Sequence, residues 1–393
     1  MKKIVKKVFL VLILSLIVNN PTYAGKIEHT DKFICNQDLN IEFVTDERLF
    51  TILAWMNWVN DNSNQLKVAK SLEQIQLEAH LKTLPEETLK EHKIAYDNYL
   101  SDTEINKDII KTFVHTRDKS NSKNFLTTGI INSYIKNALL NSDSLFYEYP
   151  GDFRIHYEDA LTDDAYRLRD IPSREILKEF YEIAGIKRLW ETKFRQKHQQ
   201  AIEKYSLQAT EILNDTACFL RNTPEYPISI RFNLIDSLGT SGQTSFSPWE
   251  KKYIIKVSVT PETNNNYIIQ VIRHEFAHSI LNESISNNSF LIEDSLKKVV
   301  KALNLNIVIP PEELIAQSIE QLNYAKSEQF IKENIAYYYK NILFIHFTEK
   351  IPEYLASNKS FKDFIPELFK SFNPEKEISR WHKIEKRIKG KDL

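Results

Sequence analysis

The chain has 393 residues, 52 basic and 53 acidic side chains, a formal net charge of −1 and seven glycines. A nucleic-acid-binding protein usually shows a basic stripe, so the near balance of charges predicts no nucleic-acid partner. Since glycine makes up about 7% of an average protein, its scarcity here predicts few tight turns and a helix-rich fold.

The first 24 residues have the layout of a secretory signal peptide. Four lysines stand among the first seven residues, an apolar run from Val8 to Val18 follows, and Thr22 and Ala24 occupy the −3 and −1 positions of a cleavage site. The apolar run is short for a bilayer, which takes about 20 residues as a helix; an uncleaved anchor is the alternative. We expect a mature chain from Gly25, without a membrane anchor, in a secreted or periplasmic location.

Removal of this segment takes four lysines and no acidic residue. The remaining 48 basic residues stand against 53 acidic ones, which gives a net charge of −5. Both cysteines, Cys35 and Cys218, lie beyond the expected cleavage site. An oxidising compartment favours a disulfide bridge between them, and two buried free thiols are the alternative.

Helical patterns dominate the region before residue 222. Residues 45–60, TDERLFTILAWMNWVN, place apolar side chains at helical spacing behind Thr45, the expected N-cap. Residues 173–221 contain no proline and one glycine and predict two or three long helices, whereas the polar stretch 115–124 predicts a loop. We expect residues 25–222 to form a helical region, which could recognise substrate or act as an inhibitory pro-segment.

Two strands are expected after this region. Residues 226–236, YPISIRFNLID, alternate between apolar and polar side chains, and residues 253–259, YIIKVSV, also read as a strand. Gly239 and Gly242 lie between them. We place a domain boundary near Asn222, so that residues 223–393 form the second domain.

Residues 266–284, NYIIQVIRHEFAHSILNES, carry the clearest chemical signal. His274 and His278 are four residues apart, so on a helix over 265–281 their imidazoles can face one metal ion. Glu275 lies about 100° round that helix, where it can accept a proton from water without binding the metal. Four residues on the other side would anchor the helix in a core: Ile268, Ile272, Phe276 and Ile280. The alternative is an ordinary core helix with two hydrogen-bonded histidines.

The segment HEFAHSILNE resembles the active-site helix of the zincin metallopeptidases, which share the His-Glu-x-x-His signature. In that family an edge strand that binds peptide lies just upstream, and YIIKVSV stands in the matching place. The following SILNESISNN lacks the glycine and third histidine of the astacin and matrix-protease branch. The resemblance therefore points to the gluzincin branch, where a glutamate on a later helix completes the site, and it is closest to uncharacterised secreted bacterial zincin-like proteins.

A catalytic zinc ion takes three protein ligands and a water molecule, so a third ligand is required. Four acidic residues follow the histidines as candidates: Glu283, Glu293, Asp294 and Glu333. Glu283 is five residues beyond His278, too close to fold back if the helix continues. Glu293 and Asp294, 15 and 16 residues beyond, leave little chain for a turn and a second helix.

Glu333 is the ligand that the resemblance implies. It lies 55 residues beyond His278. The gluzincin helix has an aromatic residue before the glutamate and an alanine and an aromatic residue after it, and the matching residues here are Phe330, Ala336 and either Tyr337 or Tyr338. The glycine that follows the glutamate in the family is Asn334 here. Glu293 and Asp294 remain the alternatives.

The expected fold is α+β and predominantly helical: a zincin-like catalytic part with a small mixed or antiparallel sheet and an active-site helix, after a helical N-terminal part. The resemblance implies a secreted zinc metallopeptidase acting on peptides or proteins. Zn²⁺ would be bound by His274, His278 and Glu333, and Glu275 would be the general base. The alternatives are a catalytically inactive zincin-like binding or host-interaction protein, and a metal-independent helical protein. His346, on an apolar stretch, is expected to be a hydrogen-bonded core residue.

Overall fold

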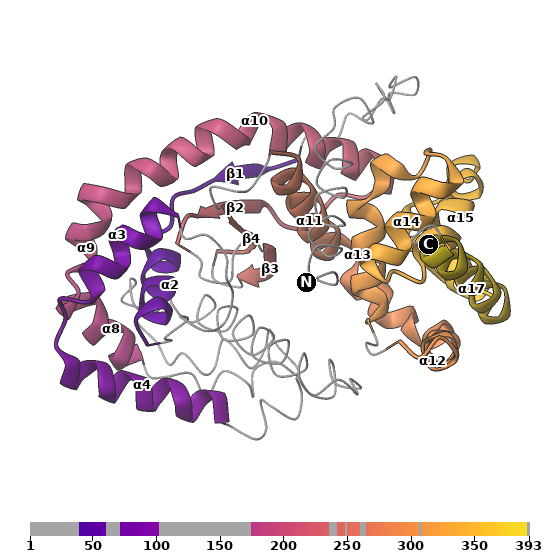
Figure 1. Ribbon diagram of the computed structural model, residues 1–393. Helices are drawn as coiled ribbons and strands as arrows, with labels where there is room; N and C mark the ends of the chain where they lie inside the picture. Colours follow the sequence, from indigo (N-terminus) through magenta and orange to yellow (C-terminus); the bar gives the residue numbers. More distant parts are fainter. Residues whose placement is uncertain are drawn as a thin grey trace. The chain divides into compact units, whose positions relative to one another are not determined.

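The computed structural model describes residues 39–59, 71–101, 174–235, 242–247, 250–259, 265–305 and 309–390 (Figure 1). The expected signal peptide, Cys35 and the expected loop at 115–124 lie outside these ranges. All described residues belong to one unit, Cys35–Leu393. None of the described helices is both long enough and apolar enough to cross a membrane.

Helices account for most of the described N-terminal part, as the scarcity of glycine predicts. They are α2 (Glu47–Val59), α3 (Leu72–Leu81), α4 (Glu86–Ser101), α8 (Arg174–Ile183), α9 (Ile186–Leu189), the π-helical turn η3 (Trp190–Phe194) and α10 (Arg195–Leu220). The helix predicted at 45–60 is present, but Asp46 caps it instead of Thr45. The Oδ1 atom of Asp46 accepts hydrogen bonds from the backbone N–H groups of Arg48 and Leu49, at 2.9 and 3.1 Å.

The long helical stretch after residue 173 is interrupted at residues 184–185. Gly185, with φ of 56°, separates α8 from α9, and α10 then continues for 26 residues. Cys218, near the end of α10, is disulfide-bonded.

Four described strands form a mixed sheet in the order β1-β2-β4-β3. They are β1 (Ile41–Phe43), β2 (Ile228–Asn233), β3 (Gly242–Ser247) and β4 (Lys252–Ser258). β1 and β4 run parallel to β2, whereas β3 is antiparallel to β4, with Thr244 opposite Ile255. Both predicted strands are confirmed. The expectation that 253–259 lies at the edge is wrong, because β3, from the segment between the two predicted strands, pairs outside it.

One strand of the sheet, β1, comes from the N-terminal region and pairs with β2. The domain boundary near Asn222 stays a prediction.

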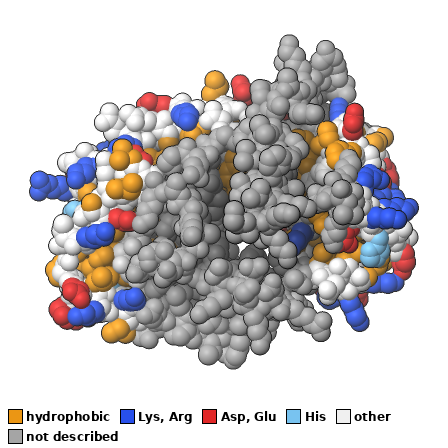
Figure 2. All heavy atoms as spheres, in the orientation of Figure 1, with side chains coloured by type: hydrophobic (Ala, Val, Ile, Leu, Met, Phe, Trp, Pro, Cys, Tyr) orange, Lys and Arg blue, Asp and Glu red, His pale blue; other side chains and the backbone are white. Residues whose placement is uncertain are grey.

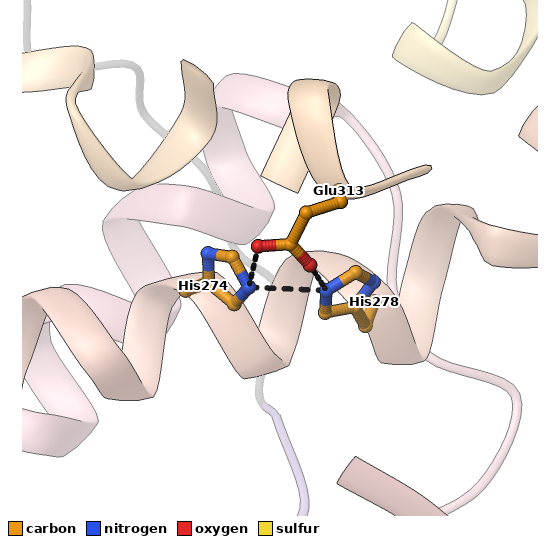
Figure 3. A group of neighbouring side chains, drawn as sticks. All are labelled: His274, His278 and Glu313. Atoms are coloured by element: carbon orange, nitrogen blue, oxygen red, sulfur yellow. Dashed lines mark hydrogen bonds and ion pairs between the residues drawn. The ribbon is translucent and has the colours of Figure 1, made fainter. Parts of the chain in front are cut away.

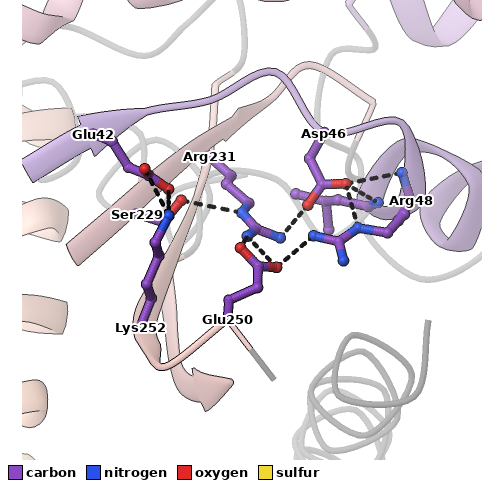
Figure 4. A network of polar contacts seen from close by, with 8 residues as sticks. Glu42, Asp46, Arg48, Ser229, Arg231, Glu250 and Lys252 are labelled. Carbon is purple, nitrogen blue, oxygen red and sulfur yellow. Dashed lines mark hydrogen bonds and ion pairs between the residues drawn. The ribbon is translucent and has the colours of Figure 1, made fainter. Parts of the chain in front are cut away.

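Both faces of β2 are buried. Ile228, Ile230 and Phe232 belong to the larger hydrophobic core, together with residues of α10 and α11. On the other face, Arg231 is 2% exposed and its charge is compensated by two carboxylates (Figure 4). Arg231 donates to Asp46 and, at 2.7–2.8 Å, to both carboxylate oxygens of Glu250.

The same ionic network reaches α2 and the β3–β4 turn. Arg48 donates to Glu250 at 2.6 Å and also pairs with Asp46. Burial alone would raise the pKa of Asp46, but the charges of Arg231 and Arg48 lower it to about 2. The network therefore fastens the start of α2 to β2 and to the turn that leads into β4.

The C-terminal part is helical throughout the described residues. It contains α11 (Asn265–Asn288), the 3-10 turn η4 (Ser289–Leu291), α12 (Glu293–Ala302), α13 (Pro311–Glu320), the 3-10 turn η5 (Leu322–Tyr324), α14 (Gln329–Tyr339), α15 (Phe344–Ala356), α16 (Phe361–Lys370) and α17 (Pro374–Gly390). His346 on α15 is a core residue, as expected, with Nε2 3.0 Å from the carbonyl oxygen of Leu368.

The described chain is thus mostly helical with a small mixed sheet, which confirms the α+β expectation at this level. Helix α11 packs against α10, α13, β3 and β4 (Figure 1). On the face drawn in Figure 2, basic and acidic side chains of the described residues lie side by side, in keeping with the balanced composition.

Candidate metal centre

Helix α11 presents both histidines of the His-Glu-x-x-His segment towards α13. The helix begins at Asn265, as predicted, and continues seven residues past the expected end at Leu281. Its predicted apolar residues are fully buried, which fixes the rotation of the helix: Ile268, Ile272, Phe276 and Ile280. The two imidazoles remain partly accessible, with 13% and 15% of their side-chain surface exposed.

Helix α13 supplies the third side chain of the cluster. Pro311 stands in its first turn, where a fixed φ and a missing N–H group are well tolerated. Glu313 follows in the same turn. Because α13 packs along α11, its first turn brings the Glu313 carboxylate over the two histidines.

Three donor groups converge at this place (Figure 3). The Nε2 atoms of His274 and His278 are 3.1 Å apart. The Nε2 atom of His274 lies 3.5 Å from Oε1 of Glu313, and that of His278 lies 3.4 Å from Oε2. These side chains could together hold a metal ion.

The other nitrogen of each imidazole already has a partner. The Nδ1 atom of His274 is 3.1 Å from Oε2 of Glu320, and that of His278 is 2.8 Å from Oδ1 of Asn282. The second carboxylate oxygen of Glu320 accepts a hydrogen bond from the Gln321 side chain at 2.9 Å. Such outer partners fix the orientation of a ring and leave its Nε2 atom for a metal.

Charge couples His274 to Glu313. Burial alone would lower the pKa of His274, but the hydrogen bond and the negative charge of Glu313 raise it well above its ordinary value. Burial alone would raise the pKa of Glu313, but the charge of His274 holds it well below its ordinary value. In the absence of a metal, the pair is therefore an imidazolium and a carboxylate.

Glu275 is 8% exposed and lies against the edge strand β3. The Thr244 hydroxyl group is 2.8 Å from Oε2 of Glu275 and also 2.8 Å from its backbone carbonyl oxygen. Glu275 directly follows His274 on α11 and is not one of the three residues whose ligand atoms converge. The role of Glu275 as general base stays a prediction.

Glu333 does not join the histidines. It is 7% exposed on α14, where its carboxylate accepts hydrogen bonds from Arg387 and, at 3.2 Å, from the Gln329 side chain. Among the described residues, the carboxylate that lies with the two histidines is that of Glu313.

The other acidic candidates also lie outside the cluster. Glu293 accepts a hydrogen bond from Ser289 at 2.6 Å, and Asp294 has 98% of its side-chain surface exposed. Glu283 is an exposed residue of α11.

Sequence reasoning did not consider Glu313, although two signals surround it. Pro310 and Pro311 predict the start of a helix 32 and 33 residues after His278, which leaves enough chain for a turn and an intervening helix. Glu313 and Glu320 are seven residues apart and therefore share one face of that helix. Acidic residues in a first turn are usually explained by the helix dipole, which conceals a metal-binding role.

Comparisons with protein-family models, with curated proteins and with solved structures found no match for this chain. The chemistry of the site is therefore inferred from its own residues.

Proposed function

We propose that this chain is a zinc-dependent metallopeptidase, with zinc bound by His274, His278 and Glu313. The observation that supports this is the convergence of the donors. The two Nε2 atoms are 3.1 Å apart, and each lies within 3.5 Å of a different Glu313 carboxylate oxygen. With one donor atom taken from each residue, all three lie within 4.8 Å of one another. Zinc–nitrogen bonds of about 2.0–2.1 Å in a tetrahedral arrangement place neighbouring ligand atoms about 3.3–3.4 Å apart. A ligand set of two histidines and one glutamate, with the fourth position open, is also typical of catalytic zinc.

The roles of the protein groups follow from their positions. A zinc ion bound there would supply a Lewis acid that activates water and polarises a carbonyl group. The Glu275 carboxylate, which is next to His274 but outside the ligand set, would take the proton of the attacking water and deliver it to the leaving amine. Glu320 and Asn282 hold the two imidazoles in the orientation that binding requires.

The position of β3 favours a peptide substrate over a smaller one. Within the described residues β3 pairs with β4 alone, so it is the edge strand next to α11. An edge strand offers backbone N–H and C=O groups with which an extended peptide can pair. A peptide added there would lie alongside Glu275.

The proposal is tested on the purified mature protein by metal analysis and by cleavage of a panel of denatured proteins. We expect one zinc ion per chain and cleavage that a chelator abolishes. Glu275→Gln should keep the zinc ion and lose turnover, whereas Glu283→Gln, an exposed glutamate on the same helix, should keep both.

Each failure has a distinct meaning. Full activity of Glu275→Gln would exclude this mechanism. Bound zinc without cleavage of any substrate would favour an inactive zincin-like binding protein, and absence of metal would favour the metal-independent helical protein.

A further inference from the structure

The edge strand β3 makes two separate contacts with Glu275. Gly242 and Thr244 are two residues apart on this strand, so both positions face the same side of the sheet, towards α11. Gln243, between them, belongs to the opposite face. Gly242 and Thr244 therefore both face α11, the helix that carries the histidines.

Thr244 contacts the carboxylate through its hydroxyl group. Its Oγ1 atom is 2.8 Å from Oε2 of Glu275 and 2.8 Å from the backbone carbonyl oxygen of the same residue. A hydroxyl group has one proton, so it donates to one of these acceptors at a time, and both lie on Glu275. The contact limits the rotamers that the Glu275 side chain can adopt.

Gly242 provides the space that the side chain fills. A Cβ atom at this position would lie 2.5 Å from Cγ of Glu275, 2.6 Å from its Oε1 and 2.6 Å from Cγ1 of Val271. These distances are far below van der Waals contact, so any larger residue would displace Glu275 or separate β3 from α11.

We propose that Gly242 and Thr244 are positioning residues that hold the Glu275 carboxylate beside the metal centre. This inference rests on the proposed function, in which Glu275 is the general base. Gly242 allows the close approach of the strand, and Thr244 selects the rotamer by its hydrogen bond. A general base held in this way needs no reorientation when a substrate binds. The benefit should therefore appear in kcat, the rate constant of the catalytic step.

The contact itself is tested without any turnover by a double-mutant cycle in the presence of a chelator. Thr244→Val removes the hydroxyl group with little change of volume, and Glu275→Met removes the carboxylate. Both backgrounds keep the backbone carbonyl oxygen of Glu275, so the cycle isolates the bond to the carboxylate. We expect a coupling of about tenfold in the unfolding equilibrium constant. Additivity of the two substitutions within about twofold would overturn the proposal.

The effect on the reaction is tested by kinetics. Thr244→Val should lower kcat by about tenfold or more, with KM and zinc content unchanged, and Thr244→Ser should restore kcat to within about twofold of the wild type. Gly242→Ala should also lower kcat while zinc stays bound. Thr192→Val is the matched control, since this exposed threonine on η3 donates to the carbonyl oxygen of Arg188, one turn earlier.

The outcomes separate the positioning role from the proposed function. Wild-type kcat in Thr244→Val and in Gly242→Ala would overturn the positioning role although the enzyme is active. A wild-type protein without zinc or turnover would contradict the proposed function, and the cycle would still decide whether Thr244 holds Glu275.

Discussion

The Nδ1 atom of His274 lies 3.1 Å from Oε2 of Glu320, while Nε2 of the same ring faces Glu313 at 3.5 Å. Both carboxylates belong to α13 and are two helical turns apart. One face of a single helix therefore carries Glu313, which we propose as the third ligand, and also Glu320, which orients His274. A small movement of α13 along α11 would change both contacts at once.

Removal of the outer carboxylate should weaken metal binding. In Glu320→Ala the His274 ring loses the acceptor that fixes its orientation, and loss of such a partner typically costs about 10–100-fold in metal affinity. Competition with a chelator of known zinc affinity measures this change. Glu312→Ala is the control on the same helix, because its carboxylate lies outside the cluster and accepts a hydrogen bond from Ser286. Equal zinc affinity of the two variants would show that Glu320 does not support the site.

Two glutamates compete for the role of third ligand, and one experiment distinguishes them. Glu313→Gln should weaken zinc binding by more than the about 100-fold expected for an outer partner. Glu333→Gln should leave zinc affinity unchanged and weaken only the contact with Arg387. The opposite result would restore Glu333, the ligand implied by the sequence resemblance.

The sequence predicts the residues of the His-Glu-x-x-His segment more readily than it predicts the third ligand. His274, Glu275 and His278 follow from spacing within one helix, because positions i and i+4 share a face whatever surrounds them. The third ligand depends on which later helix packs against α11. Several helices with glutamates follow, and only the packing of α13 on α11 selects Glu313.

The strand order of the sheet also could not be predicted from the local sequence. The local sequence predicts β2 and β4, but strand order depends on pairings between distant segments. The edge strand β3 comes from a segment whose glycines suggest a connection, and Gly242 is in fact a point of close approach to Glu275. The capping of α2 by Asp46 also depends on a distant residue, since Arg231 holds this carboxylate.

His198 should make stability depend on pH. It is 2% exposed, and burial lowers its pKa from 6.5 to about 4. Between pH 6.5 and about 4, the His198 imidazole binds a proton in the unfolded chain but stays neutral in the folded chain. The free energy of unfolding therefore falls as the pH decreases from 6.5 towards 4. A shift of this size corresponds to a loss of about 3 kcal/mol.

Denaturant unfolding between pH 7 and pH 4 tests this expectation. His198→Gln should flatten the pH dependence, and His382→Gln, at an exposed position on α17, should not. If both variants kept the wild-type slope, protonation of His198 would not be its source.

The Asp46–Arg231 pair should contribute to stability, although Glu250 also compensates the charge of Arg231. Asp46→Asn keeps a side chain that caps α2 well but removes one of the two carboxylates opposite Arg231. The lowering of the Asp46 pKa from 3.8 to about 2 corresponds to an expected loss of about 2–3 kcal/mol. Asp46→Ala removes the cap as well and should cost about 1 kcal/mol more. Lys90→Met, which breaks an exposed pair with Glu87, should change stability by less than about 0.5 kcal/mol.

The pH dependence of this contribution has a defined sign. The folded chain holds the pKa of Asp46 at about 2, below its ordinary value of 3.8, so the stabilisation is complete above 3.8 and is lost as the pH falls towards 2. The difference in unfolding free energy between the wild type and Asp46→Asn should therefore shrink over this interval. If that difference stayed constant down to pH 2, the ionised Asp46 carboxylate would not be what stabilises the junction of α2 with β2.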